Sequence, residues 1–313
     1  MARYILGVDV GSTHTDAVIV DDNGNFIGGA KTITTPDVTT GIINSMKLVL
    51  EKTKINRDEI AAVSFGTTHI INAIVQRRNL GRVGVIRIGA PATRSVDPGI
   101  DWPDDLRKTV IAGYTILRGG HEYTGEHIVE LDREGVVKAL NAFKEMKVDA
   151  IAVTSVFSIV NPEHELYVQE KAREIMPETP IVLSCEIGSV GLLERENATI
   201  LNAAVLKVMQ RAINALENAL QDLNLGHAKM FFAQNDGTVA AKEYIARYPI
   251  FTVVAPISNS IRGAYVLTKI SDAIVVDTGG TTSNIGVLRK GYPREALEIE
   301  IAGVRTNIRS PDV

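Results

Sequence analysis

Two segments of the sequence repeat one pattern, in which an apolar run leads into a turn rich in glycine and hydroxyl residues and a second apolar run follows. The first turn spans residues 9–16 (DVGSTHTD) and the second spans residues 277–284 (DTGGTTSN). An apolar run, a tight glycine-containing turn and another apolar run predict a β-hairpin. Two matching hairpins in one chain are hard to explain as ordinary turns, so they constrain the fold strongly.

Each turn begins with an aspartate at the end of a predicted buried strand, and this placement indicates a function. Asp9 and Asp277 occupy the equivalent positions. A buried carboxylate needs a partner, and a divalent metal ion or its bound water is a natural one. Glycine two residues later lets the backbone amides face a single point, which suits an anion such as phosphate. The hairpins therefore predict two phosphate loops that hold one nucleotide from opposite sides.

Composition narrows the class of protein. The 313 residues suffice for two domains, and a formal net charge of −4 without a Lys/Arg run gives no support for nucleic-acid binding. The single cysteine, Cys185, excludes an internal disulfide and a zinc site built from several cysteines. The apolar segments are too short to cross a bilayer, and the N-terminus does not resemble a signal peptide. We therefore expect a cytoplasmic protein that binds neither membranes nor nucleic acid.

The order of the predicted elements indicates an α/β fold. Residues 4–31 read as a three-stranded meander, after which strands and helices alternate. We predict a first domain over residues 1–189, with an inserted region at about 89–131, and a second, partial domain over residues 190–313. The second domain is expected to open with long connector helices. Its predicted strands before the hairpin lie at 230–233 and 251–254.

Five motifs, spread over nearly the whole chain, carry a resemblance to a known family. They are residues 9–16, Gly66-Thr67-Thr68 with Asn72 downstream, residues 158–165 (SIVNPEHE), residues 194–199 (ERENAT) and residues 277–281. In this order they resemble the hydantoinase/oxoprolinase family, and in particular the N-terminal part of its A subunit, which binds ATP. That family lies within the actin, Hsp70 and sugar-kinase superfamily. The resemblance implies an RNase H-like (actin-like ATPase) domain followed by a second, incomplete domain of the same kind.

The resemblance also implies a reaction. Members use ATP, with Mg²⁺, to activate and hydrolyse a cyclic amide ring of the hydantoin or 5-oxoproline type. The implied partners are the small-molecule cyclic amide, a B-type subunit and further copies of this chain in a homo-oligomer. The alternatives are a small-molecule kinase, a ketone carboxylase subunit with the same ATP grip, and a non-catalytic nucleotide-binding remnant. The remnant is favoured by Asn284, where the family's second loop usually ends in aspartate, and by an adenosine-binding segment expected past residue 313.

The same motifs imply roles for individual residues. Asp9 and Asp277 are expected to hold Mg²⁺ through water, and the expected catalytic group is Asp9, Asp16 and Asp277. The residues expected to bind ATP are Gly11, Ser12, Thr13, Thr15, Gly279, Gly280, Thr281 and Thr282. The residues suggested for the substrate are Thr67, Thr68, His69, Asn72, Glu194 and Arg195. Structural alternatives are a helix cap for His69 and a salt-bridged helix face for Glu194, Arg195 and Glu196.

The histidines and the single tryptophan give weaker indications of function. His121 and His127 lack the spacing of a zinc protease, so we interpret them as part of a solvated turn, and His164 as a residue that caps a helix start. Trp102 lies in a proline-rich loop, where it would either anchor an exposed loop or close over a small ring-shaped substrate.

Overall fold

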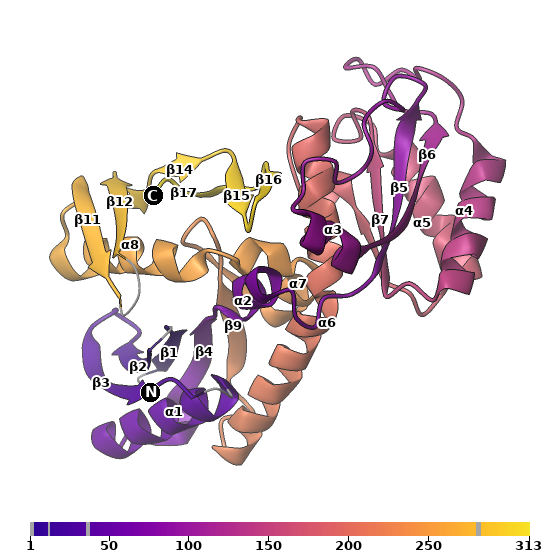
Figure 1. Ribbon diagram of the computed structural model, residues 1–313. Coiled ribbons are helices and arrows are strands. Elements are labelled where there is room, and N and C mark those ends of the chain that lie inside the picture. The colour runs from indigo at the N-terminus through magenta and orange to yellow at the C-terminus, as the bar shows by residue number, and fades with distance from the viewer. Residues whose placement is uncertain (1–2, 12, 36–37, 280–282) are drawn as a thin grey trace. The chain divides into compact units, whose positions relative to one another are not determined.

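The computed structural model in Figure 1 describes residues 3–11, 13–35, 38–279 and 283–313. Four residues of the predicted phosphate loops, Ser12, Gly280, Thr281 and Thr282, lie outside these ranges. The chain forms two compact units. The first unit comprises Met1–Ile71, Val208–Ala296 and Arg309–Val313, and the second unit comprises Asn72–Lys207 and Leu297–Ile308.

A six-stranded sheet forms the centre of the first unit. Its strands are β1 (Tyr4–Val10), β2 (His14–Asp21), β3 (Phe26–Ile33), β4 (Ile60–Gly66), β9 (Lys229–Ala233) and β10 (Val239–Ala241), in the spatial order β10-β9-β4-β1-β2-β3. The first three strands form the predicted antiparallel meander, and β4 and β9 lie parallel to β1. This arrangement is the RNase H-like topology that the resemblance implies.

The meander buries one face because its side chains alternate. In β1, Leu6, Val8 and Val10 are buried, whereas Asp9 lies on the opposite face. Helix α1 (Val38–Thr53) packs on β2 and β3, and its buried residues are Ile42, Met46, Val49 and Leu50. The aspartates of the first turn are therefore directed away from this core.

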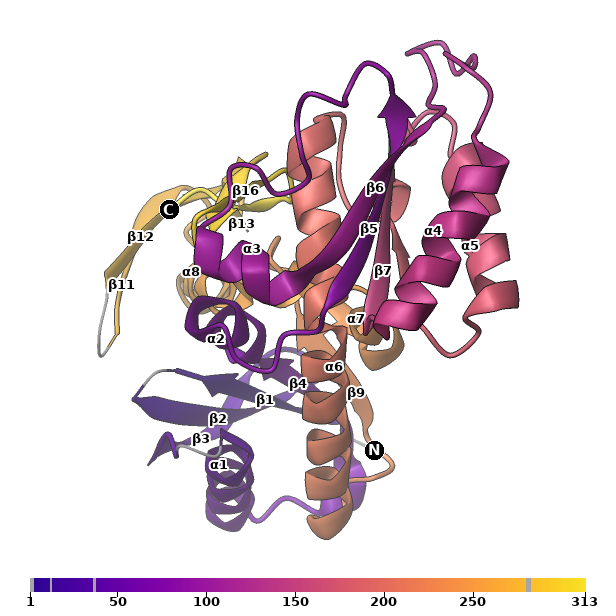
Figure 2. The same cartoon turned by 45° about the vertical axis from the view of Figure 1, so that its right-hand side comes forward.

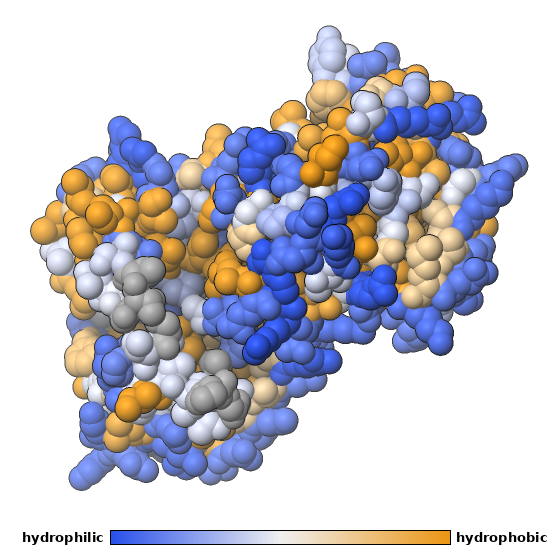
Figure 3. Space-filling view, in the orientation of Figure 1, coloured by the Kyte–Doolittle hydropathy of each residue, from blue (hydrophilic) through white to orange (hydrophobic). Residues whose placement is uncertain are grey.

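The last part of the first unit contains the second predicted hairpin. It consists of β11 (Ala273–Thr278) and β12 (Ser283–Arg289), followed by β13 (Tyr292–Pro293), and helix α8 (Ala255–Thr268) packs against it. Ile274, Val276 and Ile285 are exposed, and Figure 3 shows apolar side chains gathered over this hairpin. The smaller elements of this part are α7 (Lys242–Arg247), a 3-10 helix (Pro249–Thr252), and the pair β14 (Glu295–Ala296) and β17 (Ser310–Pro311).

The second unit is built on a four-stranded parallel sheet. Its strands are β5 (Val83–Ala90), β6 (Ile111–Arg118), β7 (Ala150–Ser155) and β8 (Ile181–Leu183), in the order β6-β5-β7-β8. Figures 1 and 2 show two helices on one face, α4 (Arg133–Met146) and α5 (Glu163–Ile175), which bury a core with Ile86, Leu140, Phe143, Ile151 and Val168. The other elements of this unit are α3 (Asp104–Val110), a 3-10 helix (Ser184–Glu186), and the pair β15 (Ile299–Ile301) and β16 (Val304–Thr306). Two helices belong to both units: α2 (His69–Gln76) begins in the first unit, and α6 (Leu192–Asp222) begins in the second. The first unit also has a 3-10 helix at Arg57–Glu59.

The units do not follow the predicted boundary at residues 189 and 190. The strand predicted at 230–233 for the second domain forms β9, which completes the first sheet beside β4. The segment that interrupts this sheet is Asn72–Lys207, much longer than the insertion predicted at about 89–131. The strand predicted at 251–254 is instead the end of a 3-10 helix followed by a turn. None of the described helices combines the length and apolar composition that crossing a membrane requires.

Candidate functional site

Three aspartates of the first unit lie where the hairpin pattern places them. In the β1–β2 pair Asp9 is opposite Asp16, and in the β11–β12 pair Asp277 is opposite Asn284. The two hairpins therefore carry their first aspartate at equivalent register positions. The carboxylates of Asp16 and Asp277 both act electrostatically on Asp9 and raise its pKa, so the structure brings the three acids into one electrostatic group.

Asp9 has the most unusual environment of the three. Its Oδ1 atom is buried and has no hydrogen-bond partner among the described residues. A Cβ at Gly66 would collide with this atom, and Asn259 of α8 lies against the same point. Burial, followed by repulsion from Asp16 and Asp277, raises the pKa of Asp9 to about 6. Glycine at position 66 is thus required for the carboxylate to occupy this space.

These features fit a divalent cation. A buried carboxylate oxygen without a partner, close to two further acids, is unfavourable alone and becomes favourable when a cation or its bound water is present. Carboxylate oxygens are also the ligands that Mg²⁺ prefers. Asp277 keeps one oxygen engaged, because its Oδ2 accepts a hydrogen bond from Ser260 Oγ of α8 at 2.7 Å. Asp16 lies 3.3 Å from Lys31 Nζ in an exposed ion pair, which solvent weakens.

The described part of the first loop is a tight turn. The amide of Gly11 donates to the carbonyl of His14 at 2.9 Å, and Thr34 Oγ1 donates to the carbonyl of Gly11 at 2.9 Å. Thr13 is exposed, and its hydroxyl lies 3.0 Å from Nδ1 of His14. Thr15 is fully buried on the α1 face, where its hydroxyl contacts that of Thr34 at 3.1 Å. The structure therefore separates the Thr15 side chain from Asp9 and Asp16, and any contact to ATP would involve its backbone.

The second loop is described only at its ends. Gly279 is exposed directly after β11, and Ser283, which opens β12, lies 3.3 Å from the hydroxyl of Thr278. The roles predicted for Gly279 and for the undescribed Gly280, Thr281 and Thr282 stay predictions.

The residues suggested for the substrate at the start of α2 are engaged in local contacts. Thr67 is buried, and its hydroxyl accepts a hydrogen bond from the His69 amide at 3.2 Å and contacts His69 Nδ1. The residue that accepts this hydrogen bond at the start of α2 is thus Thr67, whereas the structural alternative considered from the sequence was a cap by His69. Thr68 is partly exposed, and Asn72, exposed further along the helix, belongs to the second unit. A substrate role for these four residues stays a prediction.

Arg195 is committed inside the second unit. It is fully buried and donates to Ser184 Oγ at 3.0 Å and to the carbonyls of Ser155, Ser189 and Val190 at 2.7 to 2.9 Å. These bonds occupy most of its donors and clamp the start of α6 to the end of β7, which favours a structural role. Glu194 is partly exposed one residue earlier.

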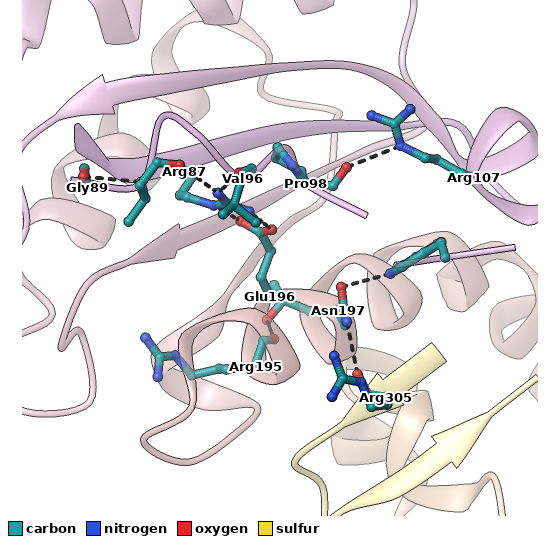
Figure 4. A network of polar contacts seen from close by, with 12 residues as sticks. Arg87, Gly89, Val96, Pro98, Arg107, Arg195, Glu196, Asn197 and Arg305 are labelled. Carbon is teal, nitrogen blue, oxygen red and sulfur yellow. Dashed lines mark hydrogen bonds and ion pairs between the residues drawn. The ribbon is translucent and has the colours of Figure 1, made fainter. Parts of the chain in front are cut away.

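The neighbouring Glu196 is salt-bridged, as one interpretation of the sequence had it, but the sequence interpretation did not identify its partner. It makes a two-pronged ion pair with Arg87 of β5, with Nε donating to Oε2 at 2.6 Å and Nη2 to Oε1, and both side chains are buried (Figure 4). Arg87 also donates to the carbonyl of Val96. The sequence did contain a signal for this ion pair, because Arg87 is the one charged residue in the otherwise nonpolar strand β5. A buried charge needs a partner elsewhere in the chain.

Trp102 anchors its loop, which is one of the two roles suggested for it, but as a buried and not an exposed side chain. It is 5% exposed, and its Nε1 donates to Asn197 Oδ1 at 2.7 Å, while Asn197 Nδ2 donates to the carbonyl of Arg305 at 2.9 Å. Figure 4 shows Asn197 between these two contacts. The tryptophan thus anchors its loop inside the second unit.

Two family descriptions match successive parts of the chain. Residues 5–176 match the hydantoinase/oxoprolinase N-terminal region, and residues 195–313 match the hydantoinase/oxoprolinase region that follows it. The chain is 26% identical over 319 residues to caprolactamase subunit alpha of Pseudomonas jessenii (92% of this chain, 44% of that one). It is also 26% identical over 317 residues to the gamma subunit of acetophenone carboxylase of Aromatoleum aromaticum (90% and 42%).

A solved structure shows the same fold. The crystal structure of the ATP-dependent caprolactamase from Pseudomonas jessenii matches with a TM-score of 0.81 and 20% identity, over 98% of this chain and 47% of that chain. The actin-like ATPase fold is therefore confirmed. The chain spans less than half the length of these relatives. The relatives include both an ATP-dependent amide hydrolase and a carboxylase. Because the two regional matches together cover most of its length, the chain belongs to the hydantoinase/oxoprolinase family.

Proposed function

We propose that this chain is the ATP-binding part of an enzyme that hydrolyses a cyclic amide, such as a hydantoin, 5-oxoproline or a lactam. The observation that carries the proposal is the group of Asp9, Asp16 and Asp277, with the unpaired Oδ1 atom of Asp9 at its centre. Support comes from the ATP-dependent caprolactamase among the structural relatives. The names of the relatives, as alpha and gamma subunits, favour a partner subunit of the B type.

The carboxylates have distinct tasks in this proposal. Asp9 and Asp277 hold Mg²⁺ through water, and Asp16 adds negative charge beside Asp9. The bound Mg²⁺ neutralises charge on the phosphates of ATP. Ser260 fixes the orientation of Asp277, so that its second oxygen stays free for the cation. The backbone amides of the two glycine-rich turns orient the terminal phosphate toward an amide oxygen of the substrate.

The chemical step is phosphoryl transfer to the amide oxygen. The oxygen attacks the terminal phosphorus of ATP, the bond to ADP breaks, and the resulting imidate phosphate carries a better electrophilic carbon than the amide. Water then adds to this carbon, and the ring C–N bond breaks as the nitrogen takes up a proton, which leaves an acyl phosphate. A second water hydrolyses this acyl phosphate to the carboxylate and inorganic phosphate. The contribution of this chain is to position the phosphate and the metal, since phosphoryl transfer depends mainly on positioning and electrostatics.

Ketone carboxylation is the second candidate, because acetophenone carboxylase is as similar in sequence as the caprolactamase. The same ATP site would suit phosphorylation of an enol or of bicarbonate, which gives an enol phosphate or carboxyphosphate, as well as phosphorylation of an amide. The two candidates differ in whether bicarbonate and a ketone, or a cyclic amide alone, accelerate phosphate release.

The test measures phosphate release by the chain together with its B-type partner, with Mg²⁺ and ATP. Stimulation by hydantoin, 5-oxoproline or caprolactam supports the hydrolase, and stimulation only by acetone or acetophenone with bicarbonate supports the carboxylase. Nucleotide binding without stimulation by either set identifies a non-catalytic binder. The Asp9→Asn variant should abolish turnover, whereas Asp22→Asn, an exposed acid in the turn after β2, should leave it unchanged. Full turnover in Asp9→Asn would refute the metal role.

A further inference from the structure

Three histidines gather at the carboxyl end of the parallel sheet in the second unit. His121 and His127 lie in the loop between β6 and α4, and His164 is the second residue of α5, after β7. The prediction of a solvated turn for His121 is wrong, because this residue is fully buried, and His164 is only 2% exposed. In open α/β sheets this edge is where ligands commonly bind.

The loop after β6 folds back on itself and thereby brings the rings together. His121 and His127 form an isolated antiparallel bridge, and the Glu122 amide donates to the Glu126 carbonyl at 2.8 Å. The His121 amide donates to the carbonyl of Val156, just past β7, at 3.1 Å. These backbone bonds place both loop histidines against the start of α5, which carries His164.

The ring geometry is compact enough for a metal ion. One nitrogen from each ring lies within 4.8 Å of the other two, and the ring centroids are 4.3, 4.7 and 5.0 Å apart. Zinc–imidazole bonds of about 2.0–2.1 Å in a tetrahedron separate ligand nitrogens by about 3.4 Å. Closing the cluster around an ion therefore needs side-chain movements of only about 1 Å.

The second observation is an unsatisfied side chain. Both Nδ1 and Nε2 of His121 are buried without a hydrogen-bond partner among the described residues. Leaving a buried polar group unpaired costs about 1–3 kcal/mol, so its presence needs a reason. A cation held by an imidazole nitrogen supplies one.

A carboxylate is placed to orient the exposed ring of the cluster. Glu163 lies 3.1 Å from Nε2 of His127. A carboxylate on one imidazole nitrogen orients the ring, as in carboxylate–histidine–zinc arrangements, and Nδ1 of His127 lies 3.5 Å from the exposed carboxylate of Glu130.

We propose that His121, His127 and His164 form a binding site for a transition-metal dication of the zinc type, with Glu163 orienting His127. Nitrogen ligands select zinc, cobalt or nickel over magnesium, which prefers oxygen. This site therefore differs in chemistry from the aspartate group of the first unit. Its fourth position is open to water or to a carboxylate.

Metal binding has a structural consequence at Gly120. Nδ1 of His164 now accepts the Gly120 amide at 3.0 Å, so the proton of its neutral ring sits on Nε2. Coordination requires a free lone pair, and loading therefore breaks the Gly120 bond. Gly120 has φ of +98°, a conformation that glycine adopts at little cost, which eases a local rearrangement.

The test is calorimetric titration of the whole chain with zinc, after removal of metal by a chelator and with excess Mg²⁺ to occupy the aspartates. We expect one zinc per chain, with Co²⁺ giving the visible absorption of a tetrahedral site. His127→Ala should weaken binding at least tenfold, and because His127 is exposed the fold should survive. Glu163→Gln should weaken binding about tenfold.

His227→Ala is the matched control, since His227 is exposed and lies outside the cluster. It should bind zinc like the unaltered chain. Hydrogen exchange of the Gly120 amide should accelerate when zinc is added, because its bond to His164 is lost. Zinc binding that is absent, exceeds one ion per chain, or is unchanged by His127→Ala would overturn the proposal, as would an equal loss in His227→Ala.

Discussion

Replacing Asp9 by asparagine should stabilise the metal-free chain while it removes function. At neutral pH the ionised carboxylate has a buried oxygen without a partner and two acids nearby, whereas an amide is neutral and nearly the same size. A cation ligand is expected to behave in this way: it lowers the stability of the metal-free chain because it is placed to bind the cation.

The magnitude follows from the pKa of Asp9. A rise from 3.8 to about 6 corresponds to about 3 kcal/mol at 1.36 kcal/mol per unit. The side chain is partly accessible, so solvent screening reduces this, and we expect a gain of about 1–2 kcal/mol in the free energy of unfolding. Because the pKa is raised in the folded state, the folded chain holds more protons between pH 3.8 and about 6. Its stability therefore falls as the pH rises through that window.

The assay is urea unfolding followed by circular dichroism, at about pH 7.5 and about pH 4, with and without Mg²⁺. At the higher pH Asp9→Asn should unfold at more urea than the unaltered chain, and the difference should shrink toward zero at the lower pH, where Asp9 is protonated in the folded state. Mg²⁺ with ATP should stabilise the unaltered chain and leave the variant unchanged. Asp22→Asn should show neither effect.

Two results would refute this reasoning. The first is an Asp9→Asn chain that is less stable than the unaltered one at about pH 7.5, since that would show the carboxylate already has a favourable partner. The second is a stability difference that does not depend on pH between about 4 and 7.5, since the raised pKa requires one.

Three further predictions concern the second unit. Glu196→Gln leaves the buried Arg87 without its charged partner and should lower the free energy of unfolding, measured by urea titration, by about 3–5 kcal/mol. The double variant Arg87→Met with Glu196→Leu should restore most of this loss, and no recovery would contradict a simple ion-pair role. Trp102→Phe removes the hydrogen bond to Asn197 and should lower the unfolding free energy by about 1–3 kcal/mol in thermal denaturation, whereas an unchanged midpoint would mean that water replaces the indole. Burial raises the pKa of Cys185, so the folded chain should react with iodoacetamide far more slowly than the urea-unfolded chain, and equal rates would show that the thiol is accessible.

The sequence predicted what depends on neighbouring residues. The repeated pattern predicts that Asp9 and Asp277 occupy equivalent positions of two hairpins, and the registers of β1 with β2 and of β11 with β12 agree with it. The meander and the second hairpin are likewise local patterns, each closed by a short turn. Local sequence was therefore enough to identify both hairpins.

What the sequence did not reveal depends on contacts between distant segments. The two compact units differ from the predicted domains because β9 pairs with β4 across the whole Asn72–Lys207 segment, and no local pattern records that pairing. His121 and His164 meet because β6 and β7 are neighbours of β5 in one parallel sheet and end at the same edge. A test based on short sequence spacing could not detect that proximity.

β9 comes late in the sequence, and this affects the order in which the chain folds during synthesis. β1 to β4 leave the ribosome first, but the open edge of β4 stays without its partner until β9 has been synthesised. At 5–20 residues per second, translation of the intervening segment takes roughly ten seconds or more. All four strands of the second unit's sheet lie in this one continuous stretch, so that sheet can form in the interval, before β9 is made. The first sheet thus waits for its later strands, and its unprotected strand edge is where we expect aggregation to begin and chaperones to act.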